Sequence, residues 1–294
     1  MARLVIADHA LACRLEGAEM SSNARFVEAR ARVAPDSGAQ WIEVAGAYAM
    51  FDAPNSPCTQ TFGLGLFQMP TAADMDRIEA FFKERGAPVL HEVSPLADKA
   101  LLPMLHERGY RPVELSNVLF LPIGADAPAS QVERPEGWTQ GAAPAPGIRN
   151  ESPPGTGSLQ VRVVGPDEKG VWARTMAEGW REFTEFADYL RDLMAVSAAI
   201  EGNTLFVAEM DGQPIAAGGL AMHGGVALLA GASTIPEWRR RGAQNLLLAA
   251  RLAHAARSGC DLAMFCAEPG SSSQRNAQRN WFQIAYTRIK WGLN

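Results

Sequence analysis

Residues 230–259, AGASTIPEWRRRGAQNLLLAARLAHAARSG, decide the fold of this chain. Just before and into this stretch, the run 226–234 is small, apolar and uncharged, which predicts a strand buried on both faces, and Pro236 then starts a turn. From Ala243 onward, leucine and alanine recur at helical spacing up to Gly259. This pattern predicts a mostly buried helix that directly follows the strand and its loop.

Three arginines and a glycine stand immediately before the predicted helix. The first turn of a helix presents unpaired N–H groups and the positive end of the helix dipole, and glycine permits a close backbone approach. The sequence therefore predicts a phosphate site here, with a solvated basic turn as the alternative. The residues predicted to form it are Arg239, Arg240, Arg241, Gly242, Ala243, Gln244 and Asn245.

The segment 239–244, RRRGAQ, resembles the acyl-CoA signature of the GNAT-type N-acetyltransferase superfamily: Arg or Gln, two residues, Gly, one residue, then Gly or Ala. The preceding TIPEW, residues 234–238, resembles the segment that leads into this signature, whereas Gln244 departs from it because a small residue is usual there. The resemblance implies an α+β fold with a mixed sheet, the GNAT-like acyl-CoA N-acyltransferase fold. It also implies acetyl-CoA (CoA) as co-substrate, without a metal.

The flanking residues agree with this order of elements. Strand-like runs at 204–210 and 214–223 come before the strand predicted at 226–234, and tight turns join the three. The run 261–267 follows the helix, and a connection through a helix makes it parallel to the strand at 226–234. In the resembled family the pantetheine arm lies between two such parallel strands. The resemblance implies main-chain contacts to it from Ser233, Thr234 and Ile235, with Asn276 near the pantetheine or thiol.

Acyl transfer to an amine needs a deprotonated amine, a donor for the developing oxyanion and a stabilised leaving thiolate. The resembled family commonly uses a glutamate on the central strands and a tyrosine on the late helix. Here the run 226–234 has no carboxylate, and the late helix predicted at 272–280 has no tyrosine. The candidates that remain are Glu268 and Tyr286, for which solvation and packing are the competing explanations.

The N-terminal part, residues 1–122, predicts a second α+β unit. Its elements are a helix at 7–33, strand-like runs at 41–51 and 59–67, a helix at 70–85, a strand at 88–93, a helix at 96–108 and a strand at 113–121. Gly86 and Gly109 can be aligned with Gly259 and Trp281, which predicts a distant internal repeat. Because this copy has no arginine run, we interpret it as a degenerate GNAT-like domain, with an unrelated α+β domain as the alternative.

Between the two parts, the Pro-, Ala- and Gly-rich stretch 123–160 predicts a linker, so the second domain spans 161–294. The net charge of −5 disfavours nucleic acid as a partner, and no apolar run indicates a signal peptide or membrane span. The four cysteines lack metal-ligand spacing and favour a reducing, cytoplasmic location. The sequence leaves the oligomeric state open, and a homodimer is compatible with it.

Two functions fit these observations. The first is an N-acetyltransferase that acts on a primary amine of a small molecule, an amino acid or a peptide. The second is a catalytically silent sensor or assembly module that binds CoA. We consider this function because the glutamate and the tyrosine are missing. The acyl chain length also stays open, because no residue pattern reports the width of the thioester pocket.

Overall fold

The computed structural model describes residues 6–124, 158–182 and 184–293. Its helices are α1 (His9–Val33), α2 (Ala72–Lys83), α3 (Leu101–Glu107), α4 (Lys169–Glu178), α5 (Ala187–Ala199), α6 (Ala243–Arg257) and α7 (Ser272–Arg279). Its strands are β1 (Gln40–Val44), β2 (Ala47–Phe51), β3 (Gln60–Phe62), β4 (Val89–Val93), β5 (Arg111–Pro122), β6 (Leu159–Val163), β7 (Thr204–Met210), β8 (Gln213–His223), β9 (Val226–Leu228), β10 (Ala232–Thr234), β11 (Leu262–Ala267) and β12 (Gln283–Leu293). No described helix is long and apolar enough to cross a membrane.

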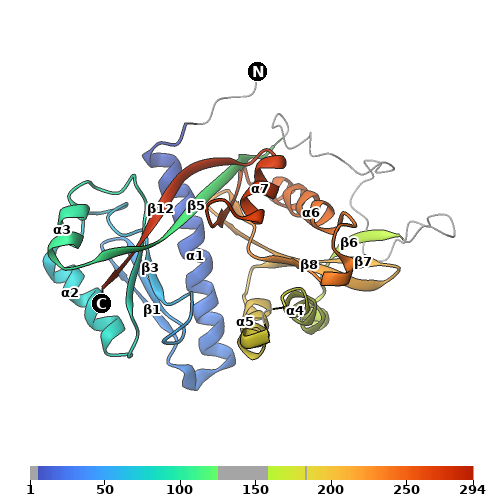
Figure 1. Cartoon of the computed structure of the whole chain (residues 1–294), viewed down its shortest axis with the longest axis horizontal. Coiled ribbons are helices and arrows are strands. Elements are labelled where there is room, and N and C mark those ends of the chain that lie inside the picture. The colour runs from blue at the N-terminus through green and yellow to red at the C-terminus, as the bar shows by residue number, and fades with distance from the viewer. Residues whose placement is uncertain (1–5, 125–157, 183, 294) are drawn as a thin grey trace.

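The described strands form one sheet in the order β1-β2-β3-β4-β12-β5-β11-β9-β8-β7-β6, with β10 paired to β8. Two strands are exchanged between the halves of the chain. The last strand, β12, pairs with β4 of the N-terminal half, and β5 pairs with β11 of the C-terminal half. Figure 1 shows β5 and β12 side by side in the middle of the molecule, with the C-terminus in the N-terminal half. The two halves are therefore joined by backbone hydrogen bonds as well as by the chain.

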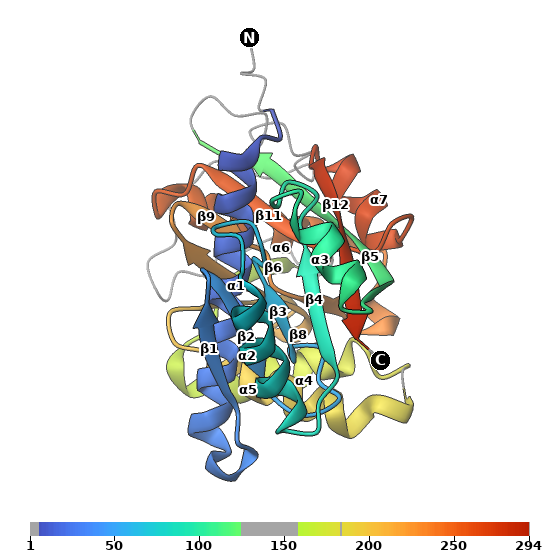
Figure 2. The same cartoon turned by 90° about the vertical axis from the view of Figure 1, so that its left-hand side faces the viewer.

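Helices cover both faces of this sheet. Helices α2 and α3 pack on one face in the N-terminal half, and α6 and α7 pack on the same face in the C-terminal half. The opposite face is covered by α1, α4 and α5. Figure 2 shows α2 and α3 in front of the strands of the N-terminal half. Because α1 packs against β9 and β11 as well as β2, the first helix of the chain covers strands of both halves.

The predicted internal repeat is visible in the backbone of the two halves. Gly109 and Trp281 both have positive φ, at 85° and 68°. The residues that follow them donate in the same way: Tyr110 N–H bonds Leu105 O, and Phe282 N–H bonds Ala277 O. Gly86 and Gly259 match likewise, with φ of 65° and 83° at the ends of α2 and α6. Equivalent turns at equivalent places in the sheet agree with the predicted repeat.

Several predicted boundaries are corrected by the structure. The run 41–51 is a hairpin, because Ala45 and Gly46 take positive φ and turn the chain. The run 59–67 is a strand only over β3, since Gly63 and Gly65 also take positive φ. The helix predicted at 96–108 begins at Leu101, after a turn in which Asp98 accepts from Ala100 N–H.

The strand predicted over 226–234 is also two strands, because β9 pairs with β11 whereas β10 pairs with β8. The predicted linker 123–160 is too long at its end, because β6 already begins at Leu159. The rest of that linker, residues 125–157, lies outside the described residues.

Candidate acyl-CoA site

The two parallel strands of the C-terminal half separate after three residue pairs. Strand β9 pairs with β11 from Val226 to Leu228, and Leu229 N–H still bonds Met264 O at 2.9 Å. Beyond this point the chain turns to β8, because Gly219 N–H donates to both Ala230 O and Gly231 O at 3.1 and 3.2 Å. Strand β10 then pairs with β8 alone. Pairing with β11 thus ends at Ala230, and we call the resulting opening between β10 and β11 the strand gap.

Close packing and a buried arginine hold the turn at the strand gap in place. A Cβ on Gly219 would lie 2.8 Å from Ala230 O, so only glycine fits there. The guanidinium of Arg251 on α6 donates to Gly219 O and Gly231 O at 3.3 and 3.4 Å. Burial lowers the pKa of Arg251 to about 10. Sequence reasoning missed this role, because the burial of Arg251, a charged residue of the predicted helix, comes from tertiary packing.

The start of α6 lies next to the strand gap and is uncapped. Gly242 has a φ of 84°, and no side chain of the described residues caps this helix. Within the described part of the chain, the N–H groups of Ala243, Gln244 and Asn245 have no hydrogen-bond acceptor. The first hydrogen bond of the helix is the one that Leu246 N–H donates to Gly242 O. Free N–H groups at the positive end of a 15-residue helix form an anion site. This geometry fits the pyrophosphate that the sequence predicted here.

The equivalent place in the N-terminal half is filled. Thr71 and Asp74 form a capping box at the start of α2, so a carboxylate of the chain already occupies the helix N-terminus. The end of β3 is closed as well: Asp98 N–H bonds Gly65 O at 2.8 Å, and a Cβ on Gly65 would lie 2.8 Å from the Leu101 side chain. Among the described residues of the N-terminal half, the helix start at α2 and the strand end at β3 are therefore both closed.

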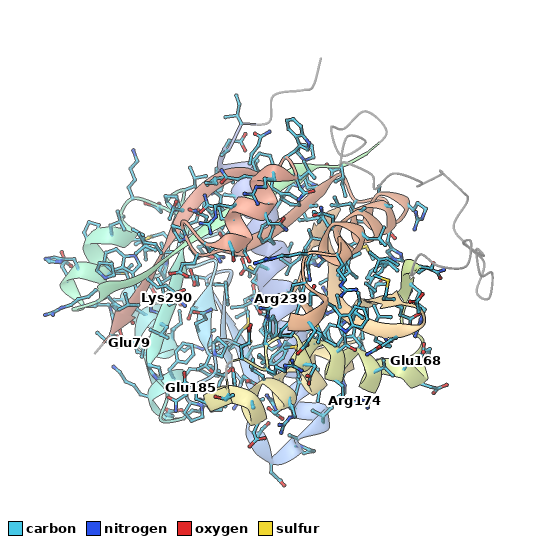
Figure 3. All side chains as sticks on the ribbon, turned by 45° about the vertical axis from the view of Figure 1, so that its right-hand side comes forward. Glu79, Glu168, Arg174, Glu185, Arg239 and Lys290 are labelled. Atoms are coloured by element: carbon cyan, nitrogen blue, oxygen red, sulfur yellow. The ribbon has the colours of Figure 1, made fainter. Side chains whose placement is uncertain are left out.

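The three arginines before α6 have different partners. Arg239 donates to Gly179 O at 3.1 Å and pairs with Glu182 at 2.6 Å, so it ties the loop to the end of α4. Figure 3 shows Arg239 near the middle of the molecule, above α4 and α5. Arg241 lies over the Trp238 ring at 4.7 Å, and Arg240 is exposed with a φ of 63°. Arg240 and Arg241 thus remain the cations available to a bound phosphate.

The predicted main-chain contacts of the pantetheine need a correction. Ile235 N–H already bonds Ile215 O at 2.9 Å, so it is not free. Because backbone groups alternate along a strand, Ser233 also faces β8, and Thr234 and Ala232 face the strand gap. The Ser233 hydroxyl donates to Met176 O, and Thr234 Oγ1 accepts from Gln244 Nε2 at 2.8 Å. Gln244 therefore joins the helix start to β10 instead of leaving space there as a small residue would.

The other predicted site residues do not meet at the strand gap. Tyr286 is buried and donates to Glu16 Oε1 at 2.8 Å, and burial raises the pKa of its phenol. Glu268 is exposed one residue after β11 and lines a surface pocket of about 790 Å³ with Val113 and Leu115. Asn276 is exposed on α7. The structure therefore brings together the residues around α6 and β10, but not the two catalytic candidates.

Comparison with known proteins agrees with this geometry. Residues 167–270 match the family model of the acetyltransferase (GNAT) domain. The whole chain is similar in fold to a GCN5-related N-acetyltransferase from Kribbella flavida, with a TM-score of 0.56 and 18% identity over 92% of this chain and 94% of that one. It is also similar to a tandem GNAT protein from the clavulanic acid biosynthesis pathway, with a TM-score of 0.54 and 14% identity over 85% and 78%.

A third structure, a GCN5-related N-acetyltransferase from Sphaerobacter thermophilus, has a TM-score of 0.51 and 18% identity over 100% of this chain and 95% of that one. No curated protein matches the sequence. The chain therefore has the fold of GCN5-related N-acetyltransferases, and its residues 167–270 are similar to an acetyltransferase (GNAT) domain. The likeness to a tandem GNAT protein over most of this chain agrees with the repeat seen in the two halves.

Proposed function

We propose that the protein transfers an acetyl group from acetyl-CoA to a primary amine of a small molecule, an amino acid or a peptide. The single observation that carries this proposal is that the uncapped start of α6 lies beside the strand gap. The free N–H groups of Ala243, Gln244 and Asn245 suit a pyrophosphate, and the strand gap lies directly beside them. An extended arm such as pantetheine would pair with the backbone edge of Ala232 and Thr234, where it would replace the bond that Thr234 O accepts from Arg239 Nε at 3.4 Å.

The reaction is attack of the amine nitrogen on the thioester carbonyl carbon. The C–N bond forms, the C–S bond breaks, and the CoA thiolate takes up a proton. One further proton leaves the amine, which reaches the enzyme largely as an ammonium at neutral pH. Much of the rate enhancement would come from holding the two reactants together at the end of the strand gap.

We further propose that only the C-terminal half, residues 161–294, binds acetyl-CoA. The N-terminal half, residues 1–122, would serve as a GNAT-like partner that contributes structure. The capping box at Thr71 and the closed end of β3 support this division, because each occupies a place that CoA would need.

The test is a calorimetric titration of the full chain with acetyl-CoA and with CoA. In Gly242→Glu, the new carboxylate would lie at the free N–H groups and repel the pyrophosphate, so we expect affinity to fall at least about tenfold. The matched control is Gly38→Glu, which adds the same charge at a glycine of similar φ, 69°, with open space around it. The control should bind as tightly as the wild type.

Thiol release in the presence of amines then separates the two functions. The panel comprises a diamine, an amino-acid methyl ester and a peptide with a free N-terminus. Amine-dependent release of CoA that is lost in Gly242→Glu would establish the acetyltransferase. Tight binding without release from any amine would favour the silent CoA-binding module, and no binding by folded wild type would overturn the site itself.

A further inference from the structure

The wall of the strand gap on the side of β11 contains Cys266. Continued pairing of β9 with β11 would place Cys266 opposite Ala230, two residues after the pair Met264 and Leu228. Ala230 turns away instead, and Cys266 is left partly exposed at the point where the strands separate. An acyl group carried along the strand gap would reach this point.

The Cys266 side chain lies on the face of the sheet covered by α1, and its thiol donates to Glu19 Oε2 at 3.2 Å. Burial raises the pKa of the Cys266 thiol well above its ordinary value, so the thiol stays protonated and serves as a donor. A carboxylate from the first helix of the chain is thus located at the end of the strand gap, 247 residues away in sequence.

Arg288 on β12 fixes the orientation of this carboxylate. Its guanidinium donates to both oxygens of Glu19, at 2.6 and 3.2 Å. Arg288 and the neighbouring Glu16 are almost fully buried, with side-chain exposures of 2% and 1%, whereas Glu19 is 13% exposed. The carboxylate of Glu19 is therefore more accessible than that of Glu16, and the buried Arg288 holds it in place.

The charge around Arg288 is not balanced. Glu16, Glu19 and Glu92 all pair with this single arginine, and Lys290 pairs with Glu92 and Glu114. Burial and the charge of Glu19 raise the pKa of Glu16, and burial raises the pKa of Glu92. A further cation beside Glu19 would relieve this excess of negative charge.

The opposite side of the turn is apolar and aromatic. A Cβ on Gly231 would lie 3.2 Å from Met176 Cε and 4.0 Å from the Trp180 ring, both at the end of α4 on the same face as α1. A carboxylate on one side and an indole on the other are the groups that recognise an ammonium ion.

We propose that Glu19, from the N-terminal half, binds the acceptor amine for the transfer reaction of the C-terminal half, and that the acceptor is a cationic amine. This proposal rests on the proposed acetyltransferase function. Glu19 would hold the ammonium at the end of the strand gap until one proton passes to water. The nitrogen then attacks the thioester carbon, the C–S bond breaks, and the CoA thiolate takes up the second proton that the nitrogen loses. The N-terminal half then completes the active site, although it binds no CoA of its own.

The test compares Glu19→Gln with Glu28→Gln, which removes an exposed charge from the same helix. Acetyl-CoA affinity, the thermal midpoint and amine-dependent CoA release are measured for each, with spermidine as the cationic acceptor and a peptide N-terminus as the weakly cationic one. For Glu19→Gln we expect kcat/KM for spermidine to fall about 100-fold, mainly through KM, with acetyl-CoA affinity within about twofold of wild type.

The possible outcomes are distinct. Failure of the wild type to bind acetyl-CoA, or to release CoA with any amine, would overturn the proposed function and this inference with it. Normal turnover by Glu19→Gln would overturn only the inference. If Glu19→Gln loses acetyl-CoA affinity and thermal stability together, the carboxylate is structural and the inference also fails.

Discussion

Arg288 on the last strand donates a hydrogen bond to Glu16 on the first helix at 3.1 Å, although the two residues are 272 positions apart. Both side chains are almost fully buried. The contact exists because β12 crosses into the N-terminal half of the sheet, where α1 covers it. The middle of this protein is therefore held together by charge as well as by apolar packing.

Replacement of Arg288 should be costly. Arg288→Met leaves Glu16, Glu19 and Glu92 without their shared cation, and removal of one partner of a buried ion pair typically costs about 3–5 kcal/mol. Urea unfolding measures the change, with Arg279→Met on the surface of α7 as the control. Adding Glu16→Gln should recover part of the loss, whereas equal stability of the two arginine variants would contradict the expected role of the network.

The exchange of β5 and β12 should make the halves inseparable. If a protease site is inserted between residues 125 and 157 and then cut, we expect the fragments to stay together during size-exclusion chromatography, because β12 keeps its pairs with β4 and β5. By contrast, residues 158–294 expressed alone would lack the strand between β11 and β12 and should not fold. A folded, monomeric C-terminal fragment in circular dichroism and NMR would show that the exchange is dispensable.

The turn at the strand gap should tolerate no side chain at Gly219. In Gly219→Ala, the new Cβ would lie 2.8 Å from Ala230 O, and the backbone would have to move. We expect a loss of about 1–3 kcal/mol in unfolding free energy and weaker binding of acetyl-CoA. Gly17→Ala on α1 is the control, since its Cβ meets nothing within 4 Å and should be neutral or stabilising. Wild-type affinity in Gly219→Ala would mean that the turn does not shape the site.

His91 should make the protein sensitive to acid. It is fully buried under α2 and α3 beside Tyr110, with Glu79 as the nearby charge, and burial lowers its pKa to about 3. A histidine with a lowered folded pKa binds fewer protons in the folded state. Its contribution to stability is therefore complete above about pH 6.5 and is lost as the pH falls toward 3.

His91→Phe should remove up to about 1.4 kcal/mol per pH unit from the slope of stability between pH 6 and 4. Chemical unfolding at a series of pH values measures this slope, with His106→Gln as the exposed control. If wild type and His91→Phe have the same slope, then His91 must titrate normally in the folded protein.

The sequence by itself determined the class of fold and the local unit of strand, arginine loop and helix. The apolar run before Pro236, the arginines, Gly242 and the alanine-rich helix are local features, and a helix N-terminus provides its N–H groups whatever surrounds it. The repeat was also predictable, because Gly86, Gly109 and Gly259 mark turns that need positive φ.

Only the tertiary structure decided which residues lie around the strand gap. The exchange of β5 and β12, the burial of Arg251 and the approach of Glu19 to Cys266 depend on contacts between segments far apart in the chain. Strand order has no local sequence signal, since β12 has the same alternating pattern beside any neighbour. A sequence also reports no distance between two side chains, so the approach of Glu19 on α1 to Cys266 on β11 became visible only after the chain had folded.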